Sequence, residues 1–541
     1  MEKTKKTNIR FNIIAIISII VFAVAITPKT LQNDTFYTIK IGEYILQNGI
    51  TMKDPFSWHN LSYTFPHWAY DVMISLIYNI GGHLGIYIST MIFAAILGII
   101  MYLMNDRFTS NKPVSFVLTI AAMFLLKDFI AARAQLFTFI LFALELLFIE
   151  GFLETGKKRY AIGLIFIPII LANFHVAVFP FYFILYLPYI AEYLISVIFD
   201  FEKHNEREIA KLDDKIIKCN NDLKKAKLYK RLEKLKDKQQ RIQKRKYKEP
   251  YKIKVVKRSK TKILIIIMIV CIFAGLLTPL KDVPYTYLIK TMKGNSTQNI
   301  SEHLPLTLAN NLNYAVVLLF FLTILIFTDT KIRLCDLFMV GGMTVLTFMS
   351  RRQESLFIIL CVPIFNRMIT AFLNKYDKNG IKEMTKLMTS ICGTIVTISI
   401  VLIISIVCYG NRFKSNYVNE KTYPVGASEW ILNNLDVKQI KLYNEYNFGS
   451  YLLFKEIPVF IDSRADLYLP EFNENVTVFD DFLTISGLGT LNMEEMFNKY
   501  EFTHFITSSK AKLRLYLDLK PEKYNKIYRD DNFYIYEKIG E

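Results

Sequence analysis

Long apolar runs constrain the fold of this 541-residue chain more than any other feature of its sequence. An uncharged run of about 20 residues favours a transmembrane helix, because a helix in lipid satisfies its backbone hydrogen bonds internally. Hydrophobic residues make up 52% of the chain, and its mean hydropathy is +0.27. We therefore predict a mainly α-helical polytopic membrane protein with about eleven transmembrane helices, near residues 11–27, 83–103, 112–127, 135–151, 160–175, 177–199, 263–280, 313–328, 334–349, 355–373 and 387–409.

The basic residues predict which side of the membrane each loop occupies. Residues 200–262 hold 24 Lys and Arg against 10 Asp and Glu, which is +14 of the chain's net charge of +18. Such a local concentration favours a cytoplasmic loop that follows the positive-inside rule over a nucleic-acid-binding surface. With the basic N-terminus in the cytoplasm, eleven spans place residues 28–82 and 410–541 outside. We expect the lipid bilayer as a partner and no nucleic acid.

The loops and the tail have predicted structures of their own. Residues 1–409 form the predicted transmembrane domain. Its first outer loop, 28–82, carries apolar residues at helical spacing, which predicts two surface helices, at 34–49 and 66–80. In the cytoplasmic insertion at 200–262, apolar residues recur every three or four positions, which predicts a helical hairpin or short coiled coil.

The tail at 410–541 has the composition of a small extracytoplasmic α/β domain. We predict helices and short strands in it. The helices are expected at 423–435 and 493–500, the strands at 440–443, 458–461 and 503–506, and a β-hairpin at 527–529 and 532–537.

Polar residues at the predicted membrane boundary gather on the outer side, away from the Lys-rich loops. Charged groups at such a depth are costly and commonly mark a substrate site. Each also has a structural alternative: a carboxylate can cap a helix, an arginine can reach lipid phosphates, and a histidine can pack in the interior. The candidates are Asp34, Arg133, Gln135, His175, Glu302, Arg351, Arg352 and Glu354, which lie in or beside several different loops.

Further candidates come from the first loop and the tail. Glu43, Asp54 and His59 add polar character to the first loop. In the tail, Asp462, Arg464 and Asp466 follow a predicted strand, where function often lies, although an internal Asp–Arg pair that fixes the loop explains them equally well. No recognised hydrolase, nucleotide-binding or metal-binding motif is present, so the sequence leaves the metal requirement unknown.

Several fragments, in this order, resemble the GT-C superfamily of membrane glycosyltransferases, and more closely a poorly characterised bacterial group of GT-C-like membrane proteins. They are NDTFYTIKIGEYILQNGITMKDPFSW, HWAYDVMISLIY, AARAQLFTFILFALEL, LANFHVAV, NISEHLP, RRQESLF and NFGSYLLF…PVFIDSRADLY. The resemblance implies a multi-pass protein of the bacterial plasma membrane that takes sugar from a polyprenyl-phosphate donor at the outer face. It also implies that Asp34 is the first-loop acidic residue, which serves as general base or as a metal or acceptor ligand. Asp34-Thr35 stands where some subfamilies have two adjacent acidic residues, and a divalent cation is an open cofactor.

The predicted function is therefore transfer of a hexose or pentose to a cell-envelope glycan, lipid or protein. A carboxylate would take the acceptor's proton, and Arg133, Arg351, Arg352 or His175 would stabilise the departing lipid phosphate. Two alternatives stay open: a non-catalytic GT-C-like protein that binds lipid-linked glycan, and a transporter or flippase of a lipid-linked precursor. A transporter typically shows internal repeats and broken helices at the midplane. We find no convincing repeat.

Overall fold

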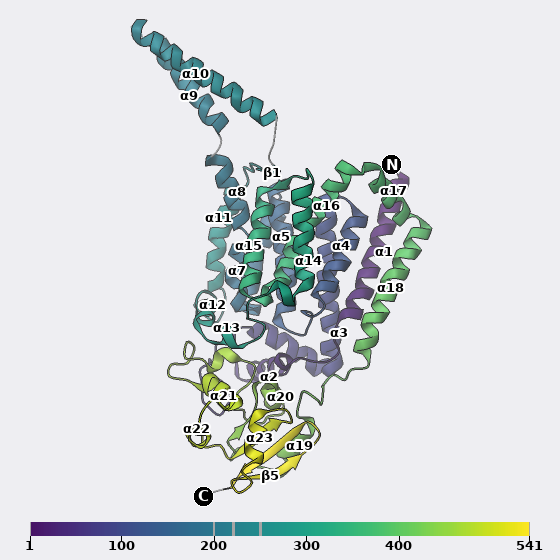
Figure 1. Ribbon diagram of the computed structural model, residues 1–541, viewed down its shortest axis with the longest axis vertical. Coiled ribbons are helices and arrows are strands. Elements are labelled where there is room, and N and C mark those ends of the chain that lie inside the picture. The colour runs from purple at the N-terminus through teal and green to yellow at the C-terminus, as the bar shows by residue number, and fades with distance from the viewer. Residues whose placement is uncertain (1, 199–200, 219–221, 248–251, 540–541) are drawn as a thin grey trace.

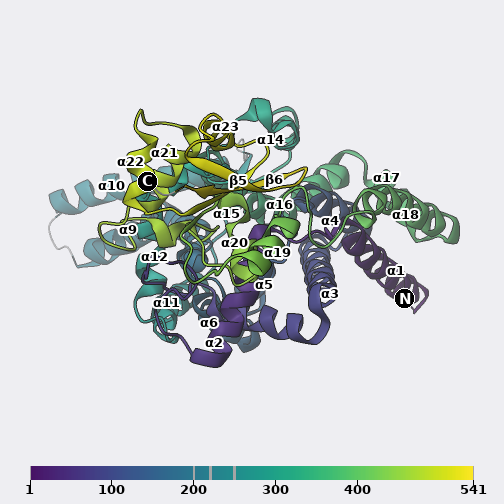
Figure 2. The ribbon, with the colours of Figure 1, turned by 90° about the horizontal axis from the view of Figure 1, so that it is seen from below.

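The computed structural model describes residues 2–198, 201–218, 222–247 and 252–539. It is mainly helical and has three parts (Figure 1). A layer of roughly parallel helices forms the centre, a helical hairpin projects from one end, and strands with short helices cover the other end. Seen from below, the C-terminal elements lie over the middle of the helical layer, while α17 and α18 lie to one side (Figure 2).

Six segments within the described residues are long and apolar enough to cross a membrane, which makes the chain compatible with a polytopic membrane protein. Each predicted span overlaps described helix, although residue 199 of the span at 177–199 lies outside the described residues and the span at 263–280 ends its helix at Leu276. The other predicted spans form shorter helices. The six lie in α1 (Glu2–Ile26), α3 (Trp68–Thr109), α5 (Ala134–Thr155), η1–α7–α8 (Val176–Val178, Phe179–Ile184, Leu187–Ile198), η4–α16 (Arg351–Gln353, Glu354–Tyr376) and α18 (Ile391–Phe413). The shorter helices are α4 (Lys112–Leu126), α6 (Lys158–Phe174), α11–η2 (Thr261–Ile272, Phe273–Leu276), α14 (Leu312–Phe327) and α15 (Leu334–Met349).

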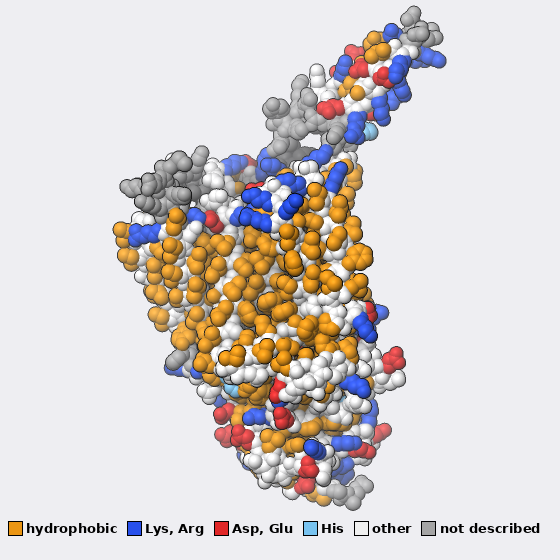
Figure 3. Space-filling view, turned by 180° about the vertical axis from the view of Figure 1, so that it is seen from behind, with side chains coloured by type: hydrophobic (Ala, Val, Ile, Leu, Met, Phe, Trp, Pro, Cys, Tyr) orange, Lys and Arg blue, Asp and Glu red, His pale blue; other side chains and the backbone are white. Residues whose placement is uncertain are grey.

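The surface of the helical layer is a continuous hydrophobic band (Figure 3). Lys and Arg side chains line its edge on the side of the projecting hairpin, and charges of both signs occur on the C-terminal part. An exposed apolar surface of this extent would be unstable in water and is typical of a lipid-facing surface.

The first predicted surface helix is present as α2 (Asn33–Asn48), and the second is the beginning of α3. The expected break between surface helix and span is a kink at Gly82, where the backbone has φ of +55°. Glycine adopts this left-handed conformation without the steric cost of a Cβ. The helices α2 and α3 pack so closely at Gly42 that a Cβ there would lie 2.1 Å from the Asp71 carbonyl oxygen.

The C-terminal part contains a four-stranded sheet in the order β3-β4-β6-β5, with β3 (Leu442–Tyr443) parallel to β4 (His504–Ser508). The hairpin of β5 (Tyr524–Arg529) and β6 (Phe533–Lys538) is antiparallel, as predicted. The predicted strand at 458–461 is wrong: only Val459 forms a bridge, with Ser57 of the first loop. The accompanying helices are α19 (Val425–Asn434), α20 (Tyr446–Phe454), η5 (Ala465–Tyr468), α21 (Val478–Gly487), α22 (Met493–Lys499) and α23 (Lys512–Asp518).

The first loop and the C-terminal part share one hydrophobic core. Phe36 of α2 is fully buried, and its ring packs 4.9 Å from that of Tyr423 and 5.1 Å from that of Tyr451. The Leu31 amide also donates to the Tyr417 carbonyl at 2.8 Å. The two segments are therefore held together by burial of apolar surface as well as by polar contacts.

The basic insertion folds as the predicted helical hairpin of α9 (Phe201–Ile217) and α10 (Asp222–Tyr247). Leu212, Ile216 and Leu232 are buried between the two helices. At this end, β1 (Ile253–Lys254) pairs in parallel with β2 (Ile332–Arg333). The remaining elements are α12 (Val283–Lys293), α13 (Ser296–Asn299), η3 (Leu308–Asn310) and α17 (Lys378–Thr389).

Candidate functional site

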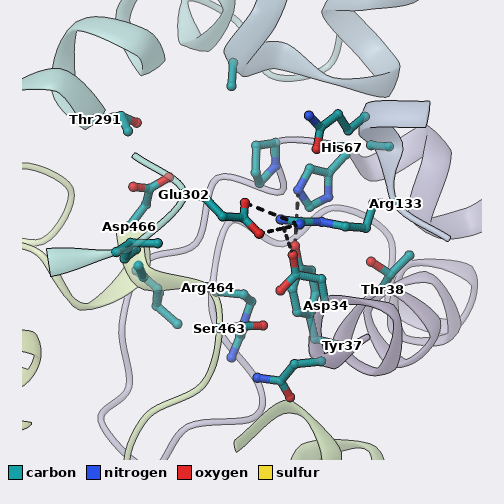
Figure 4. Close-up of a pocket in the computed structure, with 18 of the residues that line it drawn as sticks. Asp34, Tyr37, Thr38, His67, Arg133, Thr291, Glu302, Ser463, Arg464 and Asp466 are labelled. Carbon is teal, nitrogen blue, oxygen red and sulfur yellow. Dashed lines mark hydrogen bonds and ion pairs between the residues drawn. The ribbon is translucent and has the colours of Figure 1, made fainter. Parts of the chain in front are cut away.

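A polar cavity of about 390 Å³ lies where the helical layer meets the C-terminal part. Its walls come from the start of α2, the residues before α3 and α5, the loop that follows α13, and η5. Figure 4 shows Asp34, Arg133 and Glu302 pointing toward one another, with His67 and Tyr37 beside them. Segments distant in the sequence thus converge there. Eight predicted residues line the cavity, six from the membrane boundary and two from the tail: Asp34, Arg133, Gln135, His175, Glu302, Arg352, Arg464 and Asp466.

Arg133 is the centre of this cavity. It occupies the extended N-cap position of α5. Its Nη2 lies 2.5 Å from Asp34 Oδ2, and its Nη1 lies 3.1 Å from Glu302 Oε1. Burial would by itself lower the pKa of Arg133, but Asp34 and Glu302 raise it overall. Burial would likewise raise the pKa of Glu302, but Arg133 and Arg352 hold it below its ordinary value. Arg133 and Glu302 are therefore both ionised at neutral pH.

Asp34 does not cap α2. Gln32 occupies the N-cap position, and its side chain makes no capping hydrogen bond. Asp34 lies in the first turn, where a negative charge suits the helix dipole, and its carboxylate turns to Arg133. The structural alternative of an N-cap is therefore wrong, although a first-turn carboxylate still favours the helix.

Arg352 forms no ion pair with any carboxylate among the described residues, although Glu302 is close enough to interact with its charge. Its backbone amide donates to the Glu302 carbonyl at 3.1 Å, which fixes η4 beside the loop. Its guanidinium forms no ion pair or hydrogen bond with the residues described, although it lines the cavity. An unpaired cation in a half-buried position is costly, so it is suited to receive an anion.

A second cavity of about 300 Å³ adjoins the first. The two share Arg133, Glu302 and Arg352 in their walls. Arg351 and Glu354 line only the second cavity, whereas Gln135 lines both. The eight predicted boundary residues thus lie around two adjoining spaces: Asp34, Arg133, Gln135, His175, Glu302, Arg351, Arg352 and Glu354.

His175 lies at the end of α6 and is buried. Its Nδ1 is 2.8 Å from Thr138 Oγ1, and the next residue's amide donates to the Pro66 carbonyl. Burial is the main cause that lowers the pKa of His175 well below its ordinary value, and Arg352 adds to it. The imidazole is therefore neutral and acts in hydrogen bonding, not as a cation.

Sequence reasoning did not include His67 and Asp71 among the site residues. His67 Nδ1 is 3.1 Å from Asp71 Oδ1, and the carboxylate is completely buried. On its other side, His67 Nε2 lies 3.5 Å from the Tyr37 hydroxyl at the cavity wall. The signal was the four-residue spacing of the two side chains at the start of a helix, which places them on one face.

Most of the tail candidates are structural. Arg464 Nη1 lies 2.6 Å from Asp54 Oδ1, and its Nη2 lies 2.6 Å from Asp462 Oδ2. All three side chains are buried, and Asp54 also accepts from the Ser57 amide. This triad ties the first loop to the tail. Its carboxylates are fully engaged, which fits the predicted alternative of an internal Asp–Arg pair.

Asp466, Glu43 and His59 differ in where they lie relative to the main cavity and in what they contact. Asp466 lines the main cavity and accepts a hydrogen bond from the Tyr287 hydroxyl, and burial raises the pKa of its carboxyl. Glu43 lies outside it and pairs with Lys40 at 2.8 Å. His59 also lies outside it: its Nε2 is 2.8 Å from the Phe460 carbonyl oxygen, and burial lowers its pKa to about 4.

No three His, Cys, Asp or Glu side chains converge as a metal site in the part of the chain that the structure describes. The cavity instead offers guanidinium groups for an anion, carboxylates and hydroxyls for hydrogen bonds, and an imidazole for a proton. No protein-family model matches this chain, and no curated protein matches it in sequence.

Proposed function

We propose that this protein is a GT-C-like membrane glycosyltransferase that transfers a sugar from a polyprenyl-phosphate donor to an extracytoplasmic acceptor. The proposal rests on one observation: Arg133, Arg352 and several carboxylates line the same cavity, at the end of an apolar helical layer. A lipid-linked phosphate suits both features, because its apolar tail can lie in the lipid while its phosphate binds the arginines.

The proposed topology has eleven crossings, with the N-terminus in the cytoplasm and residues 410–541 outside. Its support is the row of Lys and Arg along one edge of the hydrophobic band, on the side opposite the cavity (Figure 3). The shorter helices would cross a thinned or partly covered bilayer.

In the proposed reaction, the phosphate of the donor lies between Arg133 and Arg352. The unpaired guanidinium of Arg352 needs no carboxylate to be displaced, so it can bind the phosphate first. As the bond between the sugar's anomeric carbon and the phosphate oxygen breaks, both arginines stabilise the charge that develops on that oxygen. The acceptor's hydroxyl approaches from the side of Asp466 and Tyr287, whose polar groups suit a sugar or another hydroxylated acceptor.

The test uses purified full-length protein in lipid nanodiscs with radiolabelled polyprenyl-phosphate hexoses and pentoses. Glycan, lipid and protein fractions of a bacterial envelope serve as acceptors. We expect label to move from one donor into one fraction, and Arg352→Gln to abolish most of the transfer. Arg529→Gln, on the exposed surface of β5, is the matched control and should transfer normally. Failure of every donor to transfer label would contradict the proposal.

One observation favours a transporter of the same lipid-linked precursor as a second candidate. Glu145 of α5 is fully buried, and neither carboxylate oxygen has a hydrogen-bond partner among the described residues. Buried acidic groups within spans commonly belong to ion or substrate paths. Movement of a fluorescent polyprenyl phosphate between leaflets of proteoliposomes, lost in Glu145→Gln, would favour this function over transfer.

A further inference from the structure

The geometry points to His67, oriented by Asp71, as the group that takes the proton from the acceptor in the proposed transfer. This inference rests on the proposed function and replaces the role that the family resemblance implies for Asp34. Its basis is that Asp34 and His67 have different partners: Asp34 faces a guanidinium, whereas His67 lines the cavity beside the buried carboxylate of Asp71 and the Tyr37 hydroxyl.

The pairing of His67 with Asp71 fixes the imidazole. Burial raises the pKa of the Asp71 carboxyl, and the contact with His67 opposes that rise. With the ring proton on Nδ1, 3.1 Å from Asp71 Oδ1, Nε2 keeps a lone pair and lies 3.5 Å from the Tyr37 hydroxyl at the cavity wall. The same arrangement orients the histidine of a Ser-His-Asp triad. Asp71 is held in place because α2 packs against its turn at Gly42, where no side chain intervenes.

The charged and titratable groups around His67 come from five elements. Asp71 lies on its own helix, Tyr37 on α2, His175 after α6 with its ring 6.1 Å away, and Asp466 in η5. Arg133, at the start of α5, also lies beside His67 (Figure 4). Burial raises the pKa of Tyr37 and lowers that of His175, so both of these neighbours are neutral. The carboxyl group in contact with the imidazole is that of Asp71, 3.1 Å from Nδ1.

In the proposed step, each bond formed is matched by a bond broken. An oxygen lone pair of the acceptor hydroxyl attacks the anomeric carbon, and its proton moves to His67 Nε2, giving an imidazolium beside Asp71. The bond from the anomeric carbon to the phosphate oxygen breaks, and its electron pair leaves with the polyprenyl phosphate. Arg133 and Arg352 face the phosphate, while Asp34 keeps Arg133 in position and is a positioning residue.

The first part of the test measures transfer in nanodiscs as a function of pH. We expect His67→Gln and Asp71→Asn each to lower turnover at least about 100-fold, and Asp34→Asn to lower it less. The acid limb of the residual activity should move to lower pH in Asp71→Asn, because the amide no longer favours the imidazolium. His83→Gln is the matched control: His83 lies outside the cavity and stacks on Tyr417. If His67→Gln keeps more than a tenth of the turnover while its thermal stability is unchanged, the inference is wrong.

The second part does not depend on transfer. Diethyl pyrocarbonate acylates neutral imidazole, and peptide mass spectrometry reports its rate at His67 against pH, with His83 as internal reference. In Asp71→Asn the profile of His67 should shift to lower pH, while that of His83 stays in place. An identical His67 profile in both proteins overturns the dyad even where transfer is detected. If the wild type transfers no sugar but the shift is present, the proposed function fails and the dyad stands.

Discussion

Replacing Arg352 by glutamine should change stability and ligand binding in opposite directions. In the free protein its guanidinium is half-buried, has no ion-pair partner among the described residues, and shares a cavity wall with Arg133. Removing it relieves desolvation and like-charge repulsion. We expect a gain on the order of 1 kcal/mol in the free energy of unfolding, as for other functional charges that are costly to hold.

Binding should weaken by a larger amount. A hydrogen bond to a charged group contributes about 1.5–3 kcal/mol, and 1.4 kcal/mol corresponds to tenfold in affinity. Loss of Arg352 should therefore weaken binding of farnesyl phosphate, a short polyprenyl phosphate, about 10- to 150-fold. Calorimetric titration of the protein in nanodiscs measures the affinity, and thermal denaturation measures the stability.

Arg529→Gln is the control for both measurements, because it removes an exposed arginine remote from the cavity. The reasoning is refuted if Arg352→Gln binds farnesyl phosphate as tightly as the wild type. It is also refuted if the variant is less stable than the wild type, since that would reveal a structural role for the guanidinium.

Four other changes test separate parts of the structure. Arg464→Leu should cost roughly 3–5 kcal/mol in unfolding free energy, because it leaves the buried carboxylates of Asp54 and Asp462 unpaired; a loss below about 1 kcal/mol in chemical denaturation would contradict the triad. Asp34→Asn should lower turnover roughly tenfold by loosening Arg133, and a fall above a hundredfold would make Asp34 the base. Replacing 205–255 by a short polar linker should leave transfer intact, since the hairpin projects from the end opposite the C-terminal part (Figure 1), whose residues line the cavity; loss of transfer in a folded variant would show otherwise. In a cysteine-free protein, Lys438→Cys and Lys236→Cys should react from opposite sides with an impermeant maleimide, and labelling of both from outside would refute the topology.

Elements governed by local pattern were predictable from the sequence. The helices of the layer, the hairpin at Leu212 and Leu232, and the antiparallel pair β5–β6 follow from periodicity over a few residues. The segment at 458–461 has the composition of a strand but packs against the first loop, about 400 positions away along the chain. Such a long-range contact leaves no local signal.

The sequence predicted which residues lie at the candidate site better than it predicted what each of them does there. Asp34, Arg133 and Glu302 were grouped because the predicted topology puts them on one side of the membrane, and in the structure Arg133 lies within ion-pair distance of both carboxylates. The sequence could not distinguish Arg464 from Arg352. Arg464 pairs with buried carboxylates, whereas the Arg352 guanidinium has no ion-pair partner among the described residues. That difference depends on tertiary packing, and no short pattern in a single sequence reveals it.

The core shared by the first loop and the tail has a consequence for biogenesis. Phe36 is synthesised early, but its partners Tyr423 and Tyr451 follow roughly 400 residues later. The residues of η5, which form one wall of the cavity, are synthesised after Tyr451. A nascent chain thus carries Asp34 and Arg133 through most of its insertion without a closed cavity around them. The site is complete only when the last segment has folded against the first loop, so a chain truncated near residue 410 would form its helices and have no enclosed cavity.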